Sequence, residues 1–253
     1  MTKKTLLMKK SLLLLTVLIP MLMIQTSRAG DYKNFQDQIY KAYVEDRMSL
    51  WRSTLLNMEY EYQNNPDDAL LYDILLGHYG LIGYYLGTDH EDKAKKMLEK
   101  AEPYLDIMYN RDDYEARAKL FEAAFNGFRI GLRPLRGVSL GPKSATLIDD
   151  ALEIDPSYPR GYIEKGNHMY YAPSMFGGSK SKAIEHYKKA IDMLEEGMAN
   201  NHRWLYLNTL TVLAEAYNET GSSEKAIAIL EKALTFEPDF HWVKEELLPS
   251  MKE

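Results

Sequence analysis

The sequence predicts an all-α fold, a right-handed solenoid of about four helical hairpins with a helical cap at each end. Two observations predict it. Apolar residues recur every three or four positions from Gly30 onward, and a hairpin-sized pattern of small and large apolar residues repeats along the chain. No sustained alternation of apolar and polar residues, which would indicate strands, interrupts this spacing. Residues 30–253 are therefore expected to form one cooperative helical domain.

The first 29 residues have the pattern of a secretory signal peptide. Four lysines precede an apolar run at 12–24, and small residues follow this run up to Ala29. The run is shorter than a membrane-spanning helix, which takes about 20 residues. We therefore expect cleavage after Ala29, a mature chain that starts at Gly30 without a stable membrane anchor, and a periplasmic or secreted location.

Composition excludes several chemistries. The chain has no cysteine, so disulfides, thiolate zinc sites, iron–sulfur clusters and thiol catalysis are excluded. The whole chain carries a net charge of −6, and loss of the five basic residues in 1–29 leaves 26 basic against 37 acidic residues, a net charge of −11. Nucleic acid and anionic lipid are expected to be poor partners for a surface of this charge.

The first element of the domain is the N-terminal cap, expected at residues 30–66. Within it, Trp51, Leu55 and Met58 have the spacing of one buried helix face, and Pro66 ends that helix. Four hairpins follow, and after them Trp242 and its apolar neighbours predict a short capping helix. The expected bounds are about 70–110, 113–156, 157–196 and 204–238 for the hairpins, and 239–253 for the C-terminal cap.

The clearest hairpin pattern lies at 207–238. Large and small apolar residues line one face of each helix, a glycine marks the turn between the helices and a proline ends the second one: Leu210, Leu213, Ala214, Tyr217, Gly221, Ala226, Leu230, Ala233 and Pro238. The small residues allow the two helix backbones to approach closely. This pattern resembles the tetratricopeptide repeat, with Leu210 where that family often has Trp and Ala214 where it often has Gly.

The same second-helix pattern occurs three more times upstream. Its last alanines are Ala101, Ala151, Ala190 and Ala233, and the intervals between them exceed the family unit of about 34 residues. The extra residues are expected as inserted loops or a lengthened helix where glycine and proline gather, at 131–142, 172–178 and 197–203. The first helix of the second hairpin, near 117–128, matches the family pattern poorly.

Motifs for catalysis or metal binding are absent from the sequence. The six histidines never occur three or four positions apart, so no helix presents two of them on one face as metal ligands. The glycines at 177–178 and Lys180 superficially suggest a phosphate loop, but the upstream glycine of that motif is missing. We therefore expect neither an enzyme nor a bound cofactor.

The stretch 170–178 is the most individual part of the sequence, because aromatic residues and Met175 lie between Pro173 and a Gly-Gly pair. We expect its apolar side chains to pack back on the helices, with the rim of a pocket as the alternative. Residues 157–194 are also similar to periplasmic repeat proteins that resemble the T component of TRAP transporters, which would imply a role in small-ligand transport.

In the tetratricopeptide family, outward positions of each first helix line the concave wall. The resemblance and the 170–178 stretch give these candidate binding residues: Arg160, Glu164, Asn167, Tyr170, Tyr171, Phe176, Asn208, Thr211, Glu215 and Asn218, with Glu219 beside them. The resemblance implies a non-enzymatic scaffold that binds a peptide, a protein tail or a helix in its groove. The alternative is a small-ligand-binding accessory component of a periplasmic transport system.

Overall fold

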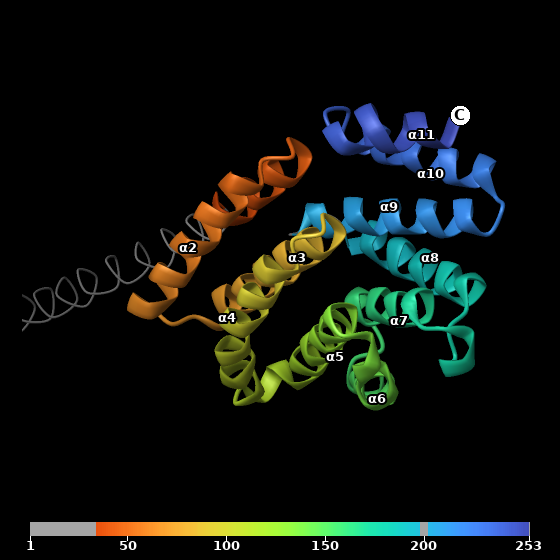
Figure 1. The fold of residues 1–253 in the computed structure, drawn as a ribbon. Helices are drawn as coiled ribbons and strands as arrows, with labels where there is room; N and C mark the ends of the chain where they lie inside the picture. Colours follow the sequence, from red (N-terminus) through yellow and green to blue (C-terminus); the bar gives the residue numbers. More distant parts are fainter. Residues whose placement is uncertain (1–33, 198–201, 253) are drawn as a thin grey trace, which may run out of the picture.

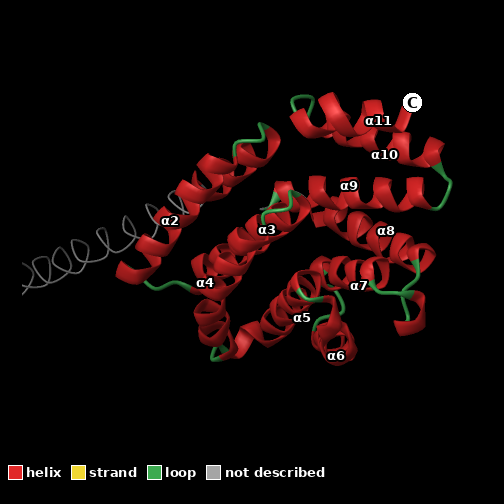
Figure 2. Cartoon of the chain, viewed as in Figure 1, coloured by secondary structure: helices red, strands yellow, loops and turns green. Residues whose placement is uncertain are grey.

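The computed structural model describes residues 34–197 and 202–252, and Figures 1 and 2 show helices joined by short loops throughout these ranges. The predicted all-α solenoid of helical hairpins is confirmed. The expected signal peptide at 1–29 lies outside the described residues and stays a prediction. Across the described ranges, no helix is both long enough and apolar enough to span a bilayer.

Successive helices pair as hairpins after the N-terminal region: α3 with α4, α5 with α6, α7 with α8 and α9 with α10. The N-terminal helix covers residues 34–44. The elements after it are α2 (Met48–Asn64), α3 (Asp68–Gly87), α4 (Glu91–Tyr109), η1 (Asp112–Tyr114), α5 (Glu115–Leu132), η2 (Pro134–Arg136), α6 (Gly137–Ile154), α7 (Pro159–Tyr171), η3 (Ser174–Phe176), α8 (Lys180–Gly197), α9 (Arg203–Glu219), α10 (Ser223–Phe236), η4 (Val243–Leu247) and α11 (Leu248–Lys252).

Small residues hold the two helices of each hairpin together. Ala183 and Ala190 on α8 and Ala226 and Ala233 on α10 are completely buried. On α7, a Cβ atom at Gly166 would lie 2.5 Å from the ring of Tyr187, so only glycine leaves room for this buried tyrosine. The alanine pattern of the sequence therefore marks the seams between the helices.

The three expected insertions differ in form. Of the two forms expected, an inserted loop or a lengthened helix, the stretch 131–142 is mostly helical, because it contains the end of α5, η2 and the first residues of α6. Pro134 opens the 3₁₀ turn, where its fixed φ is suitable. Pro142 lies inside α6, past its first turn, so the helix continues through it without the backbone bond that a proline cannot donate. The 172–178 insertion is a loop around η3, and the third insertion lies largely in 198–201, outside the described residues.

The N-terminal helix packs against the last hairpin as well as against its sequence neighbours. Its Tyr40 donates a hydrogen bond of 2.6 Å to Glu237, at the end of α10. Its Asp37 pairs with Arg203 of α9 at 2.8 Å. Figure 1 shows this red-orange end of the chain beside the blue last hairpin. The first and last parts of the solenoid are therefore in direct contact.

Aromatic packing fills the junction where these parts meet. Trp51 of α2 and Trp204 of α9 lie edge to face with 4.9 Å between ring centroids, and both are buried. Tyr43 of the N-terminal helix lies 5.8 Å from Trp204 and 5.1 Å from Phe240. A Cβ atom at Gly80 would lie 2.4 Å from Trp51, so α3 needs glycine at this position. Burial of these rings holds the closed arrangement together.

Candidate functional site

The inner helices α3, α5, α7 and α9 meet around a buried polar cluster. Arg160 of α7 is 2% exposed, and its guanidinium lies 3.7 Å from the Phe121 ring and 4.9 Å from the Tyr79 ring. Glu164 pairs with it at 3.2 Å. Burial raises the pKa of Glu164, although the charge of Arg160 lowers it. The cluster is enclosed by aromatic rings and buries an ion pair.

The two terminal guanidinium nitrogens of Arg160 are buried and make no hydrogen bond within the described residues, whereas its Nε donates a hydrogen bond of 3.3 Å to Glu164. Asn167 connects this cluster to the surface. It donates to the hydroxyl of Tyr79 at 3.2 Å, and it accepts a bond of 2.9 Å from the hydroxyl of Tyr187. The cluster therefore fixes the side chains beneath the open end of α7.

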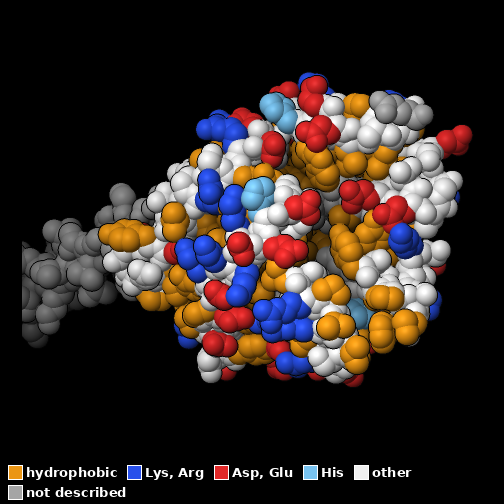
Figure 3. Space-filling view, viewed as in Figure 1, with side chains coloured by type: hydrophobic (Ala, Val, Ile, Leu, Met, Phe, Trp, Pro, Cys, Tyr) orange, Lys and Arg blue, Asp and Glu red, His pale blue; other side chains and the backbone are white. Residues whose placement is uncertain are grey.

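Four side chains at the open ends of α7 and α9 form what we name the rim cluster: Tyr170, Tyr171, Glu215 and Glu219. The two tyrosine rings lie edge to face at 4.8 Å. Tyr170 donates a hydrogen bond of 2.8 Å to Glu219, which also pairs with Lys180 of α8. Figure 3 shows acidic and hydrophobic side chains around a hollow on this face.

Glu215 is the half-buried acid of the rim cluster. Burial raises its pKa, and the negative charge of Glu219 raises it further. Burial, with a smaller contribution from the charge of Glu215, raises the pKa of Tyr171 to about 12. Burial also raises the pKa of Tyr43 on the N-terminal helix, and the charge of Glu215 adds to that shift. Among the described residues, no hydrogen-bond donor or cation pairs with Glu215. A carboxylate in this position is suited to an incoming cation.

The elbow after α7 (residues 172–178) exposes its apolar side chains. Met175 is 81% exposed and Phe176 is 46% exposed, so the prediction that they pack back on the helices is wrong. Backbone bonds hold the elbow instead, and Gly177 takes a left-handed φ of 89°. At Gly178, a Cβ atom would lie 1.7 Å from the Ala172 carbonyl oxygen. The Gly-Gly pair therefore makes the turn possible without side-chain packing.

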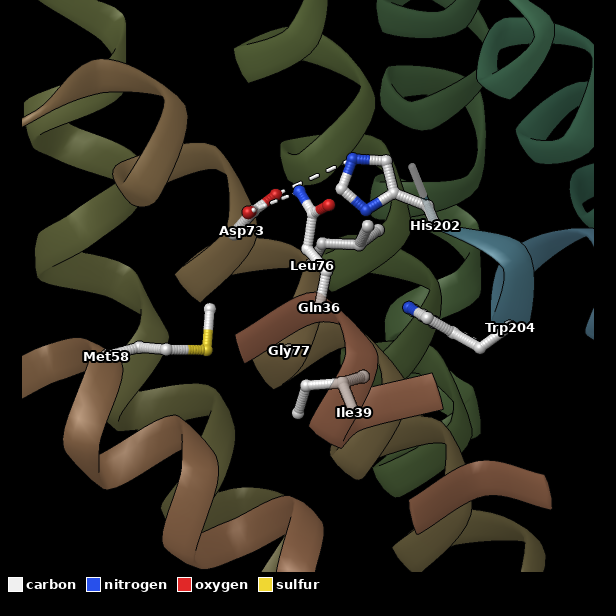
Figure 4. A pocket seen from close by; sticks show the side chains of 8 residues that line it. All are labelled: Gln36, Ile39, Met58, Asp73, Leu76, Gly77, His202 and Trp204. Atoms are coloured by element: carbon white, nitrogen blue, oxygen red, sulfur yellow. Dashed lines mark hydrogen bonds and ion pairs between the residues drawn. The ribbon is translucent and has the colours of Figure 1, made fainter. Parts of the chain in front are cut away.

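A small pocket lies between the N-terminal helix, α2, α3 and the start of α9 (Figure 4). Its volume is about 10 Å³, near the lower limit for one water molecule. Gln36 donates to Asp73 at 2.8 Å, and His202 lies 3.5 Å from the same carboxylate. Burial raises the pKa of Asp73 to about 7 and lowers that of His202 to about 4. This pocket is a packing contact between helices and is too small for any ligand larger than a water molecule.

The predicted site residues divide into three groups. Arg160, Glu164 and Thr211 are buried, so their predicted outward orientation is wrong, because the inner helices and the N-terminal helix close over this part of the wall. Asn167 and Asn208 are half-buried and hydrogen-bonded. Five others reach the open end of the inner helices or the elbow: Tyr170, Tyr171, Phe176, Glu215 and Asn218.

Sequence reasoning missed Tyr43 and Lys180 as neighbours of the rim cluster. Tyr43 accepts a bond of 3.2 Å from Asn208, which lies 165 positions further along the chain. No local pattern could place it there, because the contact depends on closure of the whole solenoid. Within the described ranges, no three His, Asp or Glu side chains are placed to hold a metal ion.

The helical hairpins and their alanine-lined contacts form a solenoid with a tetratricopeptide-like fold. Residues 207–240 match the tetratricopeptide repeat model, which covers most of α9, all of α10 and the turn that follows. No curated protein matches the sequence.

Two solved structures share the fold. The haemophore HusA of Porphyromonas gingivalis has a TM-score of 0.60 at 18% identity, over 75% of this chain and 94% of its own. A thermophilic tetratricopeptide-repeat protein of Thermus thermophilus has a TM-score of 0.56 at 18% identity, over 87% of this chain and 98% of its own. At this identity the similarity shows the fold alone.

Proposed function

We propose that the protein is a non-enzymatic binding scaffold that holds a short, positively charged segment of a partner protein at the rim cluster. Tetratricopeptide repeats generally serve protein interaction, which supports the class of function. The observation that carries the finer proposal is Glu215, a half-buried carboxylate beside Tyr171 and Tyr43 with no cation partner among the described residues. A lysine or arginine of the partner would pair with it and lie against the tyrosine rings.

The closed arrangement limits the length of the bound segment. The N-terminal helix occupies the region next to Trp204 and Asn208, which an open solenoid would offer to a long peptide. The open ends of α7 and α9 are left for the partner. We propose a periplasmic or secreted location for this interaction, on the strength of the signal-like residues 1–29.

An array of short synthetic peptides that differ in net charge tests this proposal. Peptides with lysine or arginine are expected to bind. Glu215→Gln is expected to lower their affinity about tenfold or more, since a hydrogen bond to a charged group contributes about 1.5–3 kcal/mol. Glu224→Gln, at an exposed acid on α10, is the control and should leave binding unchanged. Selection of peptides without basic residues, or binding indifferent to Glu215→Gln, would contradict the proposal.

A second candidate function is capture of a flat aromatic small molecule such as haem, as an accessory of a transport system. The exposed elbow favours it, since Tyr171, Met175 and Phe176 offer aromatic and thioether surface to solvent. The fold similarity to HusA, a haemophore, supports the same ligand class.

Haem titration followed by absorbance tests this second candidate. A saturable spectral change is expected, weakened by Tyr171→Ala or Met175→Ala and unaffected by Tyr60→Ala at an exposed tyrosine on α2. A flat titration, or equal weakening by all three variants, would exclude it.

A further inference from the structure

The turn between α5 and α6 carries unpaired positive charge in an acidic chain. From Ala123 to Ile148 the sequence has four basic residues and no acid, although the whole chain has a net charge of −6. Arg129 pairs with Glu102 and Lys143 pairs with Glu122, at 2.7 and 2.6 Å. The other two, Arg133 and Arg136, are exposed and have no ion-pair partner among the described residues. Net charge alone conceals this local excess.

Two apolar side chains protrude from the same turn. Leu135, between Arg133 and Arg136 in the sequence, is 93% exposed, and Val138, two positions after Arg136, is 68% exposed. The turn is rigid, because η2 is closed by a backbone bond of 2.9 Å from Arg136 to Arg133 and continues directly into α6. We name this feature the basic tip, residues 133–138.

We propose that the basic tip docks the protein on an anionic lipid surface. Convex apolar side chains flanked by arginines fit the boundary between headgroups and acyl chains, where Leu135 and Val138 would insert while the guanidinium groups contact phosphates. A protein partner would instead be expected to meet a concave or flat patch, because a protruding leucine needs a matching pocket. The charge of the tip, opposite to that of the rest of the chain, also orients the molecule toward such a surface.

The elbow gives the tip a neighbour of the same kind. Each of these turns joins the first helix of a hairpin to its second helix, and stacked hairpins place equivalent turns along one edge of a solenoid. The elbow exposes Met175. The basic tip lies on the α5–α6 turn and contains no residue of the rim cluster on α7 and α9, so this inference does not depend on the proposed function.

Vesicle sedimentation tests the proposal with the chain from Gly30, because the apolar run at 12–24 would itself enter lipid. Binding is expected to vesicles of phosphatidylcholine with about one third phosphatidylglycerol, and not to phosphatidylcholine alone. Arg133→Gln and Arg136→Gln should each weaken binding about fivefold, the effect of about 1 kcal/mol per basic residue. Leu135→Ser should weaken it similarly without a change in thermal midpoint, since the side chain is exposed.

The double variant Arg52→Gln/Leu56→Ser is the matched control, with an exposed arginine and leucine on α2. It should bind vesicles as the wild type does. Loss of binding equal to that of Arg136→Gln/Leu135→Ser would show general adhesion and overturn the proposal. No binding to anionic vesicles, or binding that Leu135→Ser does not change, would also overturn the proposal. An acidic protein surface would then be the expected partner of the basic tip.

Discussion

At the scale of single residues, Gly80 decides whether the two central tryptophans fit. Gly80→Ala would place a methyl group 2.4 Å from the rigid Trp51 ring, so we expect a loss of about 1–3 kcal/mol of unfolding free energy. Gly83→Ala is the control on the same helix, with nothing within 4 Å of its Cβ position, and it should be neutral or stabilising. Urea denaturation measures both, and equal midpoints would show that Trp51 does not lie on Gly80.

Asp73 makes stability depend on pH. Its pKa is about 7 in the folded state, above the ordinary value, so the stability it contributes is complete below about pH 4 and is lost as pH rises through 7. Asp73→Asn keeps an acceptor for Gln36 and cannot ionise. The stability advantage of the variant over the wild type should therefore be larger at pH 8 than at pH 5, by at most about 3 kcal/mol, since each pH unit between 5 and 7 contributes about 1.4 kcal/mol. Urea denaturation at pH 5 and pH 8 measures this. If the midpoints of the variant and the wild type differ by the same amount at both pH values, the assignment is wrong.

His202 acts in the opposite sense in the same pocket. Burial lowers its pKa to about 4, so the stability it contributes is present above about pH 6.5 and is lost as pH falls through 4. The two side chains lie 3.5 Å apart. At mildly acidic pH both are uncharged in the folded state, and the contact between α3 and the start of α9 is then most stable.

At the scale of elements, the buried alanines between paired helices could be predicted from the sequence, because the spacing of apolar residues along each helix indicates its buried face. Ala226 is completely buried and Ala228 is exposed, as the repeat register predicts. Ala226→Leu should cost about 1–3 kcal/mol by overpacking, whereas Ala228→Leu should cost little. Chemical denaturation compares the two, and similar losses would show an error in the register of α10.

The elbow was harder to predict, because a loop's side chains can face either way while its sequence stays the same. Phe176 is 46% exposed, so Phe176→Ala should cost less than about 1.5 kcal/mol, well below the 3–5 kcal/mol typical of a buried phenylalanine. Calorimetry of the variant measures this difference. A large drop in the melting temperature would mean that the ring packs on the helices after all.

At the scale of the whole molecule, closure of the solenoid decides which candidate residues can meet a partner. Hairpin order followed from the repeats, but contact between the first helix and the last hairpin did not. The residues that make it, such as Asp37 and Arg203, are 166 positions apart and carry no local signal. For this reason Arg160 and Glu164 were expected on an open wall and are buried in a closed one.

This closure is the central claim, and the absence of cysteine makes it measurable with two introduced labels. Lys41→Cys and Asp239→Cys place spin labels at exposed positions beside the Tyr40–Glu237 contact. Double electron–electron resonance should return one short, narrow distance distribution, which broadens when Trp204→Ala removes the aromatic junction. A long or broad distribution in the otherwise unaltered chain would mean that the solenoid is open, with its full concave wall available to a partner.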